Sequence, residues 1–172
     1  MILLEPTIAD KEQVAAYRAS FLENNEIIHG SSGLENAESI EKWLELQEAY
    51  KSPATVPADH VPSRVYLAKE ANQVVGILNL RLELNNYLLQ YGGHIGYSVK
   101  KNFRQKGYAT AMLAQSLPLA RSFGLEKVLV TCDEKNLASA KVIEKNGGQL
   151  EDIRIDPTDG SSTRRYWLST NQ

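Results

Sequence analysis

The segment from Val99 to Thr110 constrains the fold of this chain more than any other part of its sequence. A run typical of a β-strand ends at Lys100, a basic turn follows, and apolar residues recur at helical spacing from Ala109 onward. Gly107 stands where that helix begins, and the first amide N–H groups of a helix have no partner within it. A glycine there also lets a bulky anion approach the backbone closely. The segment therefore predicts an anion-binding site at the junction of a strand and a helix.

The composition shows that the positive charge of this junction is local. The formal net charge of the 172 residues is −2, so no broad electrostatic surface for nucleic acid or an anionic membrane is expected. The basic residues of the junction are Lys100, Lys101, Arg104 and Lys106. A nucleic-acid binder that uses them is a weaker alternative, because the patch is small.

Other features are typical of a cytoplasmic single-domain protein. Cys132 is the one cysteine, so no internal disulfide can form, as expected in a reducing compartment. Residues 1–6 lack the pattern of a signal peptide, and no stretch approaches the ~18 apolar residues of a membrane helix. No cluster of histidine, cysteine and carboxylate side chains has the spacing of metal ligands. We therefore expect one domain, 1–172, without a metal, a membrane or a nucleic acid as partner.

The periodicity of the apolar residues predicts an alternation of strands and helices. Strands are predicted at residues 2–5, 64–70, 74–84, 94–100, 127–131, 149–155 and 163–169. Helices are predicted after Thr7, at residues 37–50, from Ala109 to a stop at Gly124, and at residues 136–146. The resulting order, β-α-α-β-β-β-α-β-α-β-β, is typical of a layered α/β or α+β domain.

The amino-acid sequence of the junction indicates which anion it binds. It contains neither a Walker loop nor the three-glycine dinucleotide fingerprint. It reads Arg104-Gln105-Lys106-Gly107-Tyr108-Ala109, which matches the pattern Arg/Gln-x-x-Gly-x-Gly/Ala. A second block follows, with Asn136, the small residue Ser139 three positions on, and Lys145-Asn146-Gly147-Gly148 at a helix end.

On these residues the chain resembles the GNAT superfamily of N-acetyltransferases, over about Val65 to Gly148. The stretch Tyr91–Tyr97 is most similar to a subgroup described only as predicted acetyltransferases. The resemblance implies a mixed, mostly antiparallel sheet of six to seven strands, flanked by helices, in which strands 4 and 5 splay apart. It also implies acetyl-CoA as co-substrate, with its diphosphate on the junction and its pantetheine arm in the gap between the two strands.

The resemblance further implies which residues hold acetyl-CoA. Backbone groups near Tyr97, Ser98 and Val99 would pair with the arm and polarise the acetyl carbonyl. Asn136 would bind the arm from the other side, or serve only as the N-cap of its helix. The full set of expected cofactor-binding residues is Ser98, Val99, Arg104, Gln105, Lys106, Gly107, Tyr108, Ala109, Thr110, Asn136 and Ser139.

The proton-transfer groups depart from the usual pattern of the family. A base must deprotonate the attacking amine, and many members carry a carboxylate on the fourth strand. This chain has His94 at or within one residue of that position, either as the base or as a structural histidine. Many members have a tyrosine as acid where this chain has Ile143, so either another group such as Tyr97 is the acid or the thiolate leaves unassisted. The remaining candidates are Tyr108 and Cys132 as acids and Glu83 as base, each with a more ordinary structural reading.

The acceptor is a primary amine of a small molecule or a peptide, and the transfer is expected to be direct. The alternatives are a protein N-terminal or lysine acetyltransferase, and a non-catalytic acyl-CoA-binding or sensor module, which Ile143 supports. Acidic residues in the expected acceptor regions would suit a cationic amine, although a solvated surface explains them better; they are Glu23, Glu26, Glu35, Glu38, Asp156 and Asp159. Tyr166 and Trp167 could form a homodimer seam or belong to the core.

Overall fold

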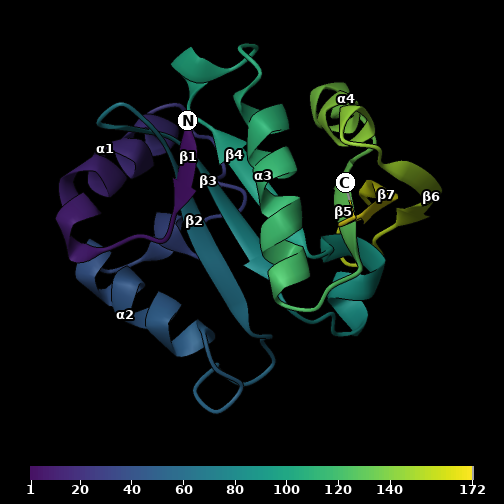
Figure 1. The fold of residues 1–172 in the computed structure, drawn as a ribbon, viewed down its shortest axis with the longest axis horizontal. Coiled ribbons are helices and arrows are strands. Elements are labelled where there is room, and N and C mark those ends of the chain that lie inside the picture. The colour runs from purple at the N-terminus through teal and green to yellow at the C-terminus, as the bar shows by residue number, and fades with distance from the viewer. Residues whose placement is uncertain (172) are drawn as a thin grey trace.

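The computed structural model describes residues 1–171 and shows the expected order of strands and helices (Figure 1). The strands are β1 (Ile2–Leu4), β2 (Ser63–Glu70), β3 (Gln73–Arg81), β4 (Ile95–Val99), β5 (Lys127–Asp133), β6 (Gln149–Ile155) and β7 (Ser162–Ser169). The α-helices are α1 (Lys11–Leu22), α2 (Ile40–Tyr50), α3 (Tyr108–Ser122) and α4 (Leu137–Lys145). No helix of residues 1–171 is long and apolar enough to cross a membrane.

All seven strands form one sheet in the order β1-β2-β3-β4-β5-β7-β6. Neighbouring strands are antiparallel except β4 and β5, which are parallel and joined at a single residue pair, Ile95 with Val130. Beyond that pair the two strands separate toward Val99 and Asp133. The prediction of a mixed, mostly antiparallel sheet with splayed strands 4 and 5 is confirmed.

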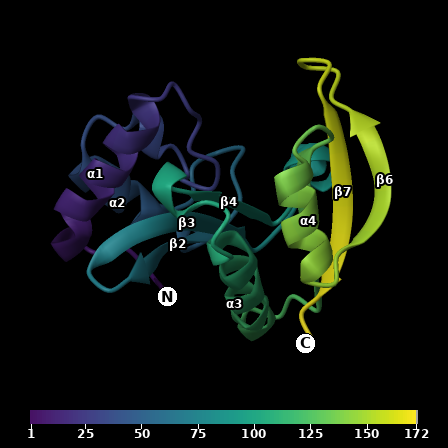
Figure 2. The ribbon, with the colours of Figure 1, turned by 90° about the horizontal axis from the view of Figure 1, so that it is seen from above.

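The sheet buries apolar side chains on both faces. On β2, Val65 and Leu67 pack into a cluster with α1 and α2, whereas Tyr66 and Ala68 pack into a cluster with α3. This division follows from the period of two of a β-strand, which sends alternate side chains to opposite faces. Figure 2 shows α1 and α2 on one side of β2–β4 and α3 on the other. Any polar residue on the α1/α2 face of β3 or β4 therefore lies beneath these helices.

Strand β3 ends three residues earlier than predicted, at Arg81 instead of Leu84. The Leu82 N–H donates to the Pro62 carbonyl at 2.8 Å, and the chain then leaves the sheet to form a loop over residues 82–93. The side chain of Asn85 accepts a hydrogen bond from the Leu88 N–H at 2.9 Å, which starts a short helical turn. Glu83 consequently lies exposed in this loop and not on a strand.

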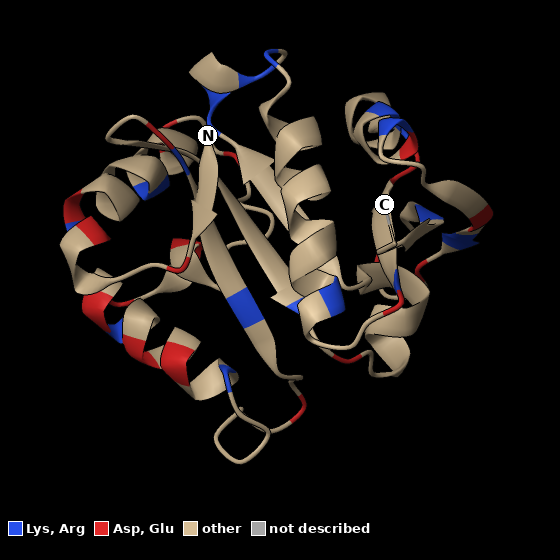
Figure 3. Cartoon of the chain, viewed as in Figure 1, with Lys and Arg blue, Asp and Glu red and all other residues tan. Residues whose placement is uncertain are grey.

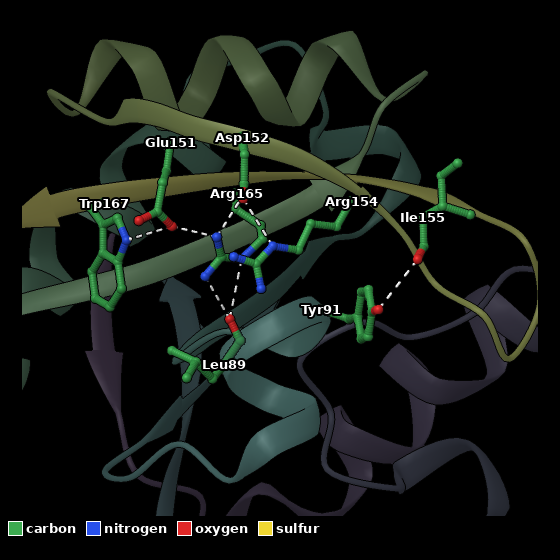
Figure 4. A network of polar contacts seen from close by, with 8 residues as sticks. All are labelled: Leu89, Tyr91, Glu151, Asp152, Arg154, Ile155, Arg165 and Trp167. Carbon is green, nitrogen blue, oxygen red and sulfur yellow. Dashed lines mark hydrogen bonds and ion pairs between the residues drawn. The ribbon is translucent and has the colours of Figure 1, made fainter.

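A buried arginine fastens the 82–93 loop to the sheet (Figure 4). The Arg165 side chain on β7 is 2% exposed and forms ion pairs with Glu151 and Asp152 of β6. Its guanidinium also donates to the Leu89 carbonyl from Nη2 at 2.8 Å. Because the charge of Arg165 is paired and its guanidinium is hydrogen-bonded, we assign this cluster a structural role.

Candidate active site

The junction between β4 and α3 presents a row of unpaired backbone amides, which we call the amide cradle (residues 105–110). Among residues 1–171, no hydrogen-bond partner is recorded for these N–H groups; the first paired amide of α3 is Ala111, which donates to the Gly107 carbonyl at 3.0 Å. Gln105 and Gly107 adopt φ angles of 61° and 84°, which turn successive N–H groups toward the same side. No atom lies within 4 Å of the position of a Cβ at Gly107, so the approach to the cradle is open.

The cradle lies in the most basic turn of the chain. Figure 3 shows Lys and Arg in blue along the connection between β4 and α3. Lys106 donates to the Asn102 carbonyl at 2.9 Å, and the Phe103 and Tyr108 rings stack edge to face at 5.7 Å. These contacts hold the turn in shape while its amides stay free. The arrangement is the one that an anion such as a diphosphate requires.

Arg104 acts as a clamp for this turn. Its Nε donates to the Val99 carbonyl at 2.9 Å, its guanidinium pairs with Glu26 beyond α1, and it lies 5.6 Å from the centre of the Phe21 ring. The hydrogen bond from Arg104 holds the pKa of the Glu26 carboxyl below its ordinary value. Arg104 is predicted to be a ligand of the cofactor; in the structure its side chain contacts Val99 of β4, Phe21 of α1 and Glu26.

Two side chains meet across the gap between β4 and β5. The Tyr97 hydroxyl on β4 lies 2.8 Å from the Ser139 hydroxyl on α4. Asn136 caps α4, because its Oδ1 accepts from the Ser139 N–H at 3.0 Å. Burial raises the pKa of Tyr97 to about 12, so its phenol stays protonated at neutral pH. The position of the usual family tyrosine is filled by Ile143, which is 0% exposed.

The other predicted residues of this region lie around the gap. Ser98 is tied to α1, since the Tyr17 hydroxyl donates to its carbonyl at 3.0 Å. Ala109 packs on the α3 core, and the Thr110 carbonyl accepts a hydrogen bond from the Asn146 side chain at 3.2 Å. Burial raises the pKa of the Cys132 thiol, which leaves it a poor nucleophile and a structural residue.

His94 joins β4 to β5 at the closed end of the gap. Its N–H donates to the Leu129 carbonyl at 2.7 Å, and the Leu129 N–H donates to its Nδ1 at 2.9 Å. Burial, followed by the charge of Arg81, lowers the pKa of His94 to about 4, so the ring is neutral at pH 7. With Nδ1 accepting, the ring proton belongs on Nε2, and no lone pair is free to take a proton from an amine. This geometry favours the structural reading of His94 over the general base.

A pocket of ≈ 400 Å³ lies on the α2 side of the sheet, at the end of β3. It is formed by the loop at Ser32, by α2, by residues of the 59–63 segment with Asp59 and His60 among them, by the end of β3 and by the 82–93 loop. Asn79 and Arg81 of β3 line it, and Asn79 is the register partner of Gly96 on β4. Neither residue is among those predicted from the sequence. The available signal was two polar side chains, Asn79 and Arg81, inside the otherwise apolar run Val74–Leu82.

The acidic residues that could have attracted a cationic amine are largely engaged elsewhere. Glu26 pairs with Arg104, and Glu35 accepts from the Ser31 hydroxyl at 2.6 Å. Asp156 accepts from the Thr158 N–H at 2.8 Å and from the Tyr87 hydroxyl at 3.1 Å. Among the described residues 1–171, no group of three or more His, Cys, Asp or Glu side chains could hold a metal ion.

Comparison with known proteins relates this geometry to an enzyme family. A variant of the spermidine N-acetyltransferase SpeG from Vibrio cholerae superimposes with a TM-score of 0.67 at 16% identity, covering 99% of this chain and 95% of that chain. The microcin C7 self-immunity acetyltransferase MccE, solved with acetyl-CoA and AMP, gives a TM-score of 0.67 at 15% identity over 97% and 91%. A GNAT acetyltransferase from Streptococcus pneumoniae gives 0.64 at 16% identity over 98% of each chain.

These identities are low, so the structural likeness shows a shared fold. A search of curated proteins gave no match. The family model described as an acetyltransferase (GNAT) domain, in contrast, matches residues 1–149, which is most of the sequence. The chain therefore belongs to the GNAT acetyltransferase family.

Proposed function

We propose that this protein is an acetyl-CoA-dependent N-acetyltransferase that acts on a primary amine of a small molecule or peptide, with residues 1–172 working as one domain. The observation that carries the proposal is the amide cradle at the open end of the gap between β4 and β5. Its unpaired N–H groups and the open space at Gly107 fit a diphosphate. Acetyl-CoA bound there supplies an activated acyl group.

The residues of the gap would orient the acyl group for direct attack by the amine. Tyr97 lies on the strand along which the pantetheine arm would run, and Ser139 faces it from α4. The protonated Tyr97 phenol is placed to give a proton to the leaving thiolate, with Ser139 as its hydrogen-bond partner. Asn136 directs its Oδ1 into the cap of α4, which leaves its amide nitrogen for the arm.

In this proposal His94 is a structural residue that links β4 to β5 by hydrogen bonds, and it is not the base. The proton of the attacking amine would leave through water in the pocket. A cytoplasmic location and a homodimer stay predictions. Tyr166, a candidate for the dimer seam, is 1% exposed within the core, and its hydroxyl donates to Glu144 at 3.1 Å.

The proposal is tested by binding and turnover together. Calorimetric titration with acetyl-CoA should show saturable binding, and release of free CoA thiol should depend on an added primary amine. Absence of binding would contradict the proposal. Binding without amine-dependent thiol release over a broad amine panel would instead favour the acyl-CoA-binding or sensor module, for which the buried Ile143 is the supporting observation.

A further inference from the structure

The geometry of the ≈ 400 Å³ pocket at the end of β3 points to an acceptor that carries an anionic group as well as its amine. We infer that the Arg81 guanidinium binds this group, a carboxylate or a phosphonate, while Asn79 receives an N–H of the amine. The inference rests on the proposed N-acetyltransferase function and names the substrate class of the same site.

Arg81 carries a charge that forms no ion pair with an acidic side chain of the described chain, although Asp59 lines the same pocket. Its Nη1 donates to the carbonyls of Gly92 and Gly93 at 3.3 and 3.1 Å, and no Asp or Glu of residues 1–171 forms an ion pair with it. Burial lowers the pKa of Arg81, although a guanidinium stays protonated at neutral pH. A desolvated cation without a counterion is unfavourable, so a bound anion would stabilise it.

Other buried or pocket-lining cations of the chain do have acidic partners. Arg165 pairs with two carboxylates. Lys51 lines a second pocket of ≈ 400 Å³ between α2 and the residues after β1, and it pairs with Glu5 at 2.7 Å and Glu48 at 2.5 Å. Arg81 thus lacks the acidic partner that these cations have, and it lies in a pocket large enough for a small molecule, whereas Arg18, which also forms no ion pair, lines neither pocket.

Asn79 supplies a second, independent indication of a ligand. It is 5% exposed, and its Oδ1 is shut off from solvent without a hydrogen-bond partner among residues 1–171. Four described side chains carry such an atom, and Asn79 is the one of them that lines this pocket. A buried acceptor left unpaired is costly, so a donor from a ligand in the pocket would stabilise it. Asn79 lies opposite Gly96, next to Tyr97 on β4, which is where the acyl group would be attacked.

The spacing of the two side chains sets the kind of acceptor. Asn79 and Arg81 are two residues apart on one face of β3, roughly 7 Å along the strand. An amine on Asn79 and an anion on Arg81 are therefore separated by a few atoms, as in an amino acid. The Tyr50 hydroxyl, which has no recorded partner among the described residues, is a further donor toward an anion. A polyamine would add positive charge beside Arg81 instead.

The loop at residues 30–33 closes the pocket against β4. A Cβ at Gly30 would collide with the Gly96 carbonyl, so glycine is needed for this approach, and its φ of 76° is one that glycine accepts. Ser31 holds the loop in place, because its carbonyl accepts from the Trp43 indole at 2.8 Å. Ser32 and Gly33 of this loop line the pocket together with Tyr50 and Tyr87, and its volume of ≈ 400 Å³ suits a small molecule.

The test compares matched amines that differ in one group. The probes are a panel of α-amino acids, their decarboxylated amines, their carboxamides, and an aminoalkylphosphonate, each assayed by acetyl-CoA-dependent thiol release. The expected result is that kcat/KM for the anionic members exceeds that of their neutral counterparts by about 10- to 100-fold, the range for hydrogen bonds to a charged group. Equal kcat/KM values with and without the anionic group would overturn the inference.

Substitutions of Arg81 test whether this residue causes the preference for anionic amines. Arg81→Gln should remove the preference by raising KM for the anionic amines while leaving acetyl-CoA affinity unchanged, and Arg81→Lys should keep part of it. Lys51→Gln is the matched control, since it removes a cation from the second pocket and should keep the preference. A preference that survives in Arg81→Gln would contradict the inference, provided calorimetry shows that this variant still binds acetyl-CoA.

Binding of product-like probes separates this inference from the proposed function. Wild type and Arg81→Gln are titrated with N-acetylmethionine and with its carboxamide in the presence of CoA. Tighter binding of the carboxylate in the wild type alone supports the anion subsite even if no amine is acetylated, in which case the proposed function fails by itself. Equal binding of the two probes in the wild type counts against the subsite even if acetyl transfer is observed.

Discussion

The two ends of strand β4 present positive charge in different ways. After β4, the amide cradle uses backbone N–H groups from one continuous segment, residues 105–110. Before β4, the pocket uses the Arg81 side chain, which comes from β3 and is surrounded by α2 and the 82–93 loop. A backbone site tolerates changes of most of its side chains, whereas a site built on one side chain depends on that residue. We therefore expect cofactor binding and acceptor choice to respond to different substitutions.

Arg165 sharpens this comparison because it is a buried arginine whose partners are complete. Its guanidinium is neutralised by β6 carboxylates, whereas that of Arg81 contacts only backbone carbonyls. The same side chain therefore serves structure in one place and is available to a ligand in the other.

The largest expected effect is on cofactor binding and tests the backbone site. Gly107→Glu places a side chain and a negative charge in the open space before the cradle, where it would repel a diphosphate. We expect acetyl-CoA affinity to fall at least 1000-fold, about 4 kcal/mol, as measured by calorimetry. Gly124→Glu is the matched control: it lies beyond the other end of α3 with φ 86° and the same open space, so it introduces similar backbone strain. Equal losses in both variants would show that strain, and not the cradle, is responsible.

The next effect compares the two arginines. Arg165→Met removes a buried charge and leaves two carboxylates and the Leu89 carbonyl without their partner, so the free energy of unfolding should fall by about 3 kcal/mol. Arg81→Met removes an unneutralised charge and should change stability by less than about 1 kcal/mol. Urea unfolding of both variants measures the difference. A larger loss for Arg81→Met would mean that its charge is compensated within the fold.

The pH dependence of stability tests the junction at His94, which separates the two sites. The folded pKa of about 4 lies below the value of 6.5 expected for an unfolded histidine. Above pH 6.5 both states are neutral; as the pH falls from 6.5 to 4, the unfolded state binds a proton that the folded state does not. The free energy of unfolding should therefore fall by up to about 3 kcal/mol over this window.

Unfolding of two histidine variants, measured as a function of pH, isolates the contribution of His94. His94→Asn, which retains an acceptor for the Leu129 N–H, should lose this part of the pH dependence, whereas the exposed His29→Asn should keep it. An unchanged dependence in His94→Asn would show that groups other than His94 cause it. The activity of that variant should keep the wild-type pH profile, and a shifted profile would restore His94 as a base.

The smallest effect concerns the acid at the gap. Tyr97→Phe removes the hydroxyl that meets Ser139 and should lower kcat about 10-fold, because a thiolate leaves readily and needs little help. Acetyl-CoA affinity should stay within a factor of two or so, since the expected contacts with the arm are made by the backbone. Tyr66→Phe, on the buried part of β2, is the control. An unaltered kcat in Tyr97→Phe would mean that the thiolate leaves unassisted.

Local signals predicted the strand, the turn and the helix around the amide cradle well. The end of β4, the basic turn and the start of α3 lie within residues 95–110, and their geometry depends on local strand and helix propensities and on a glycine at positive φ. The β3 boundary failed because residues 82–84 carry strand-like side chains, but Leu82 pairs with Pro62 and the loop that follows is held through Leu89 by Arg165. Long-range contacts overrode local propensity there.

The sequence by itself determined the order of the elements, the splayed sheet through its family resemblance, and the position of the amide cradle. Only the tertiary structure decided that His94 has no free lone pair, that Tyr97 meets a hydroxyl from α4, and that Arg81 stays without an acidic partner. Backbone donors at a helix start are unpaired wherever that helix begins, so one segment reveals them. The protonation and pairing of a buried side chain depend on every element packed around it, and those elements come together only in the folded chain.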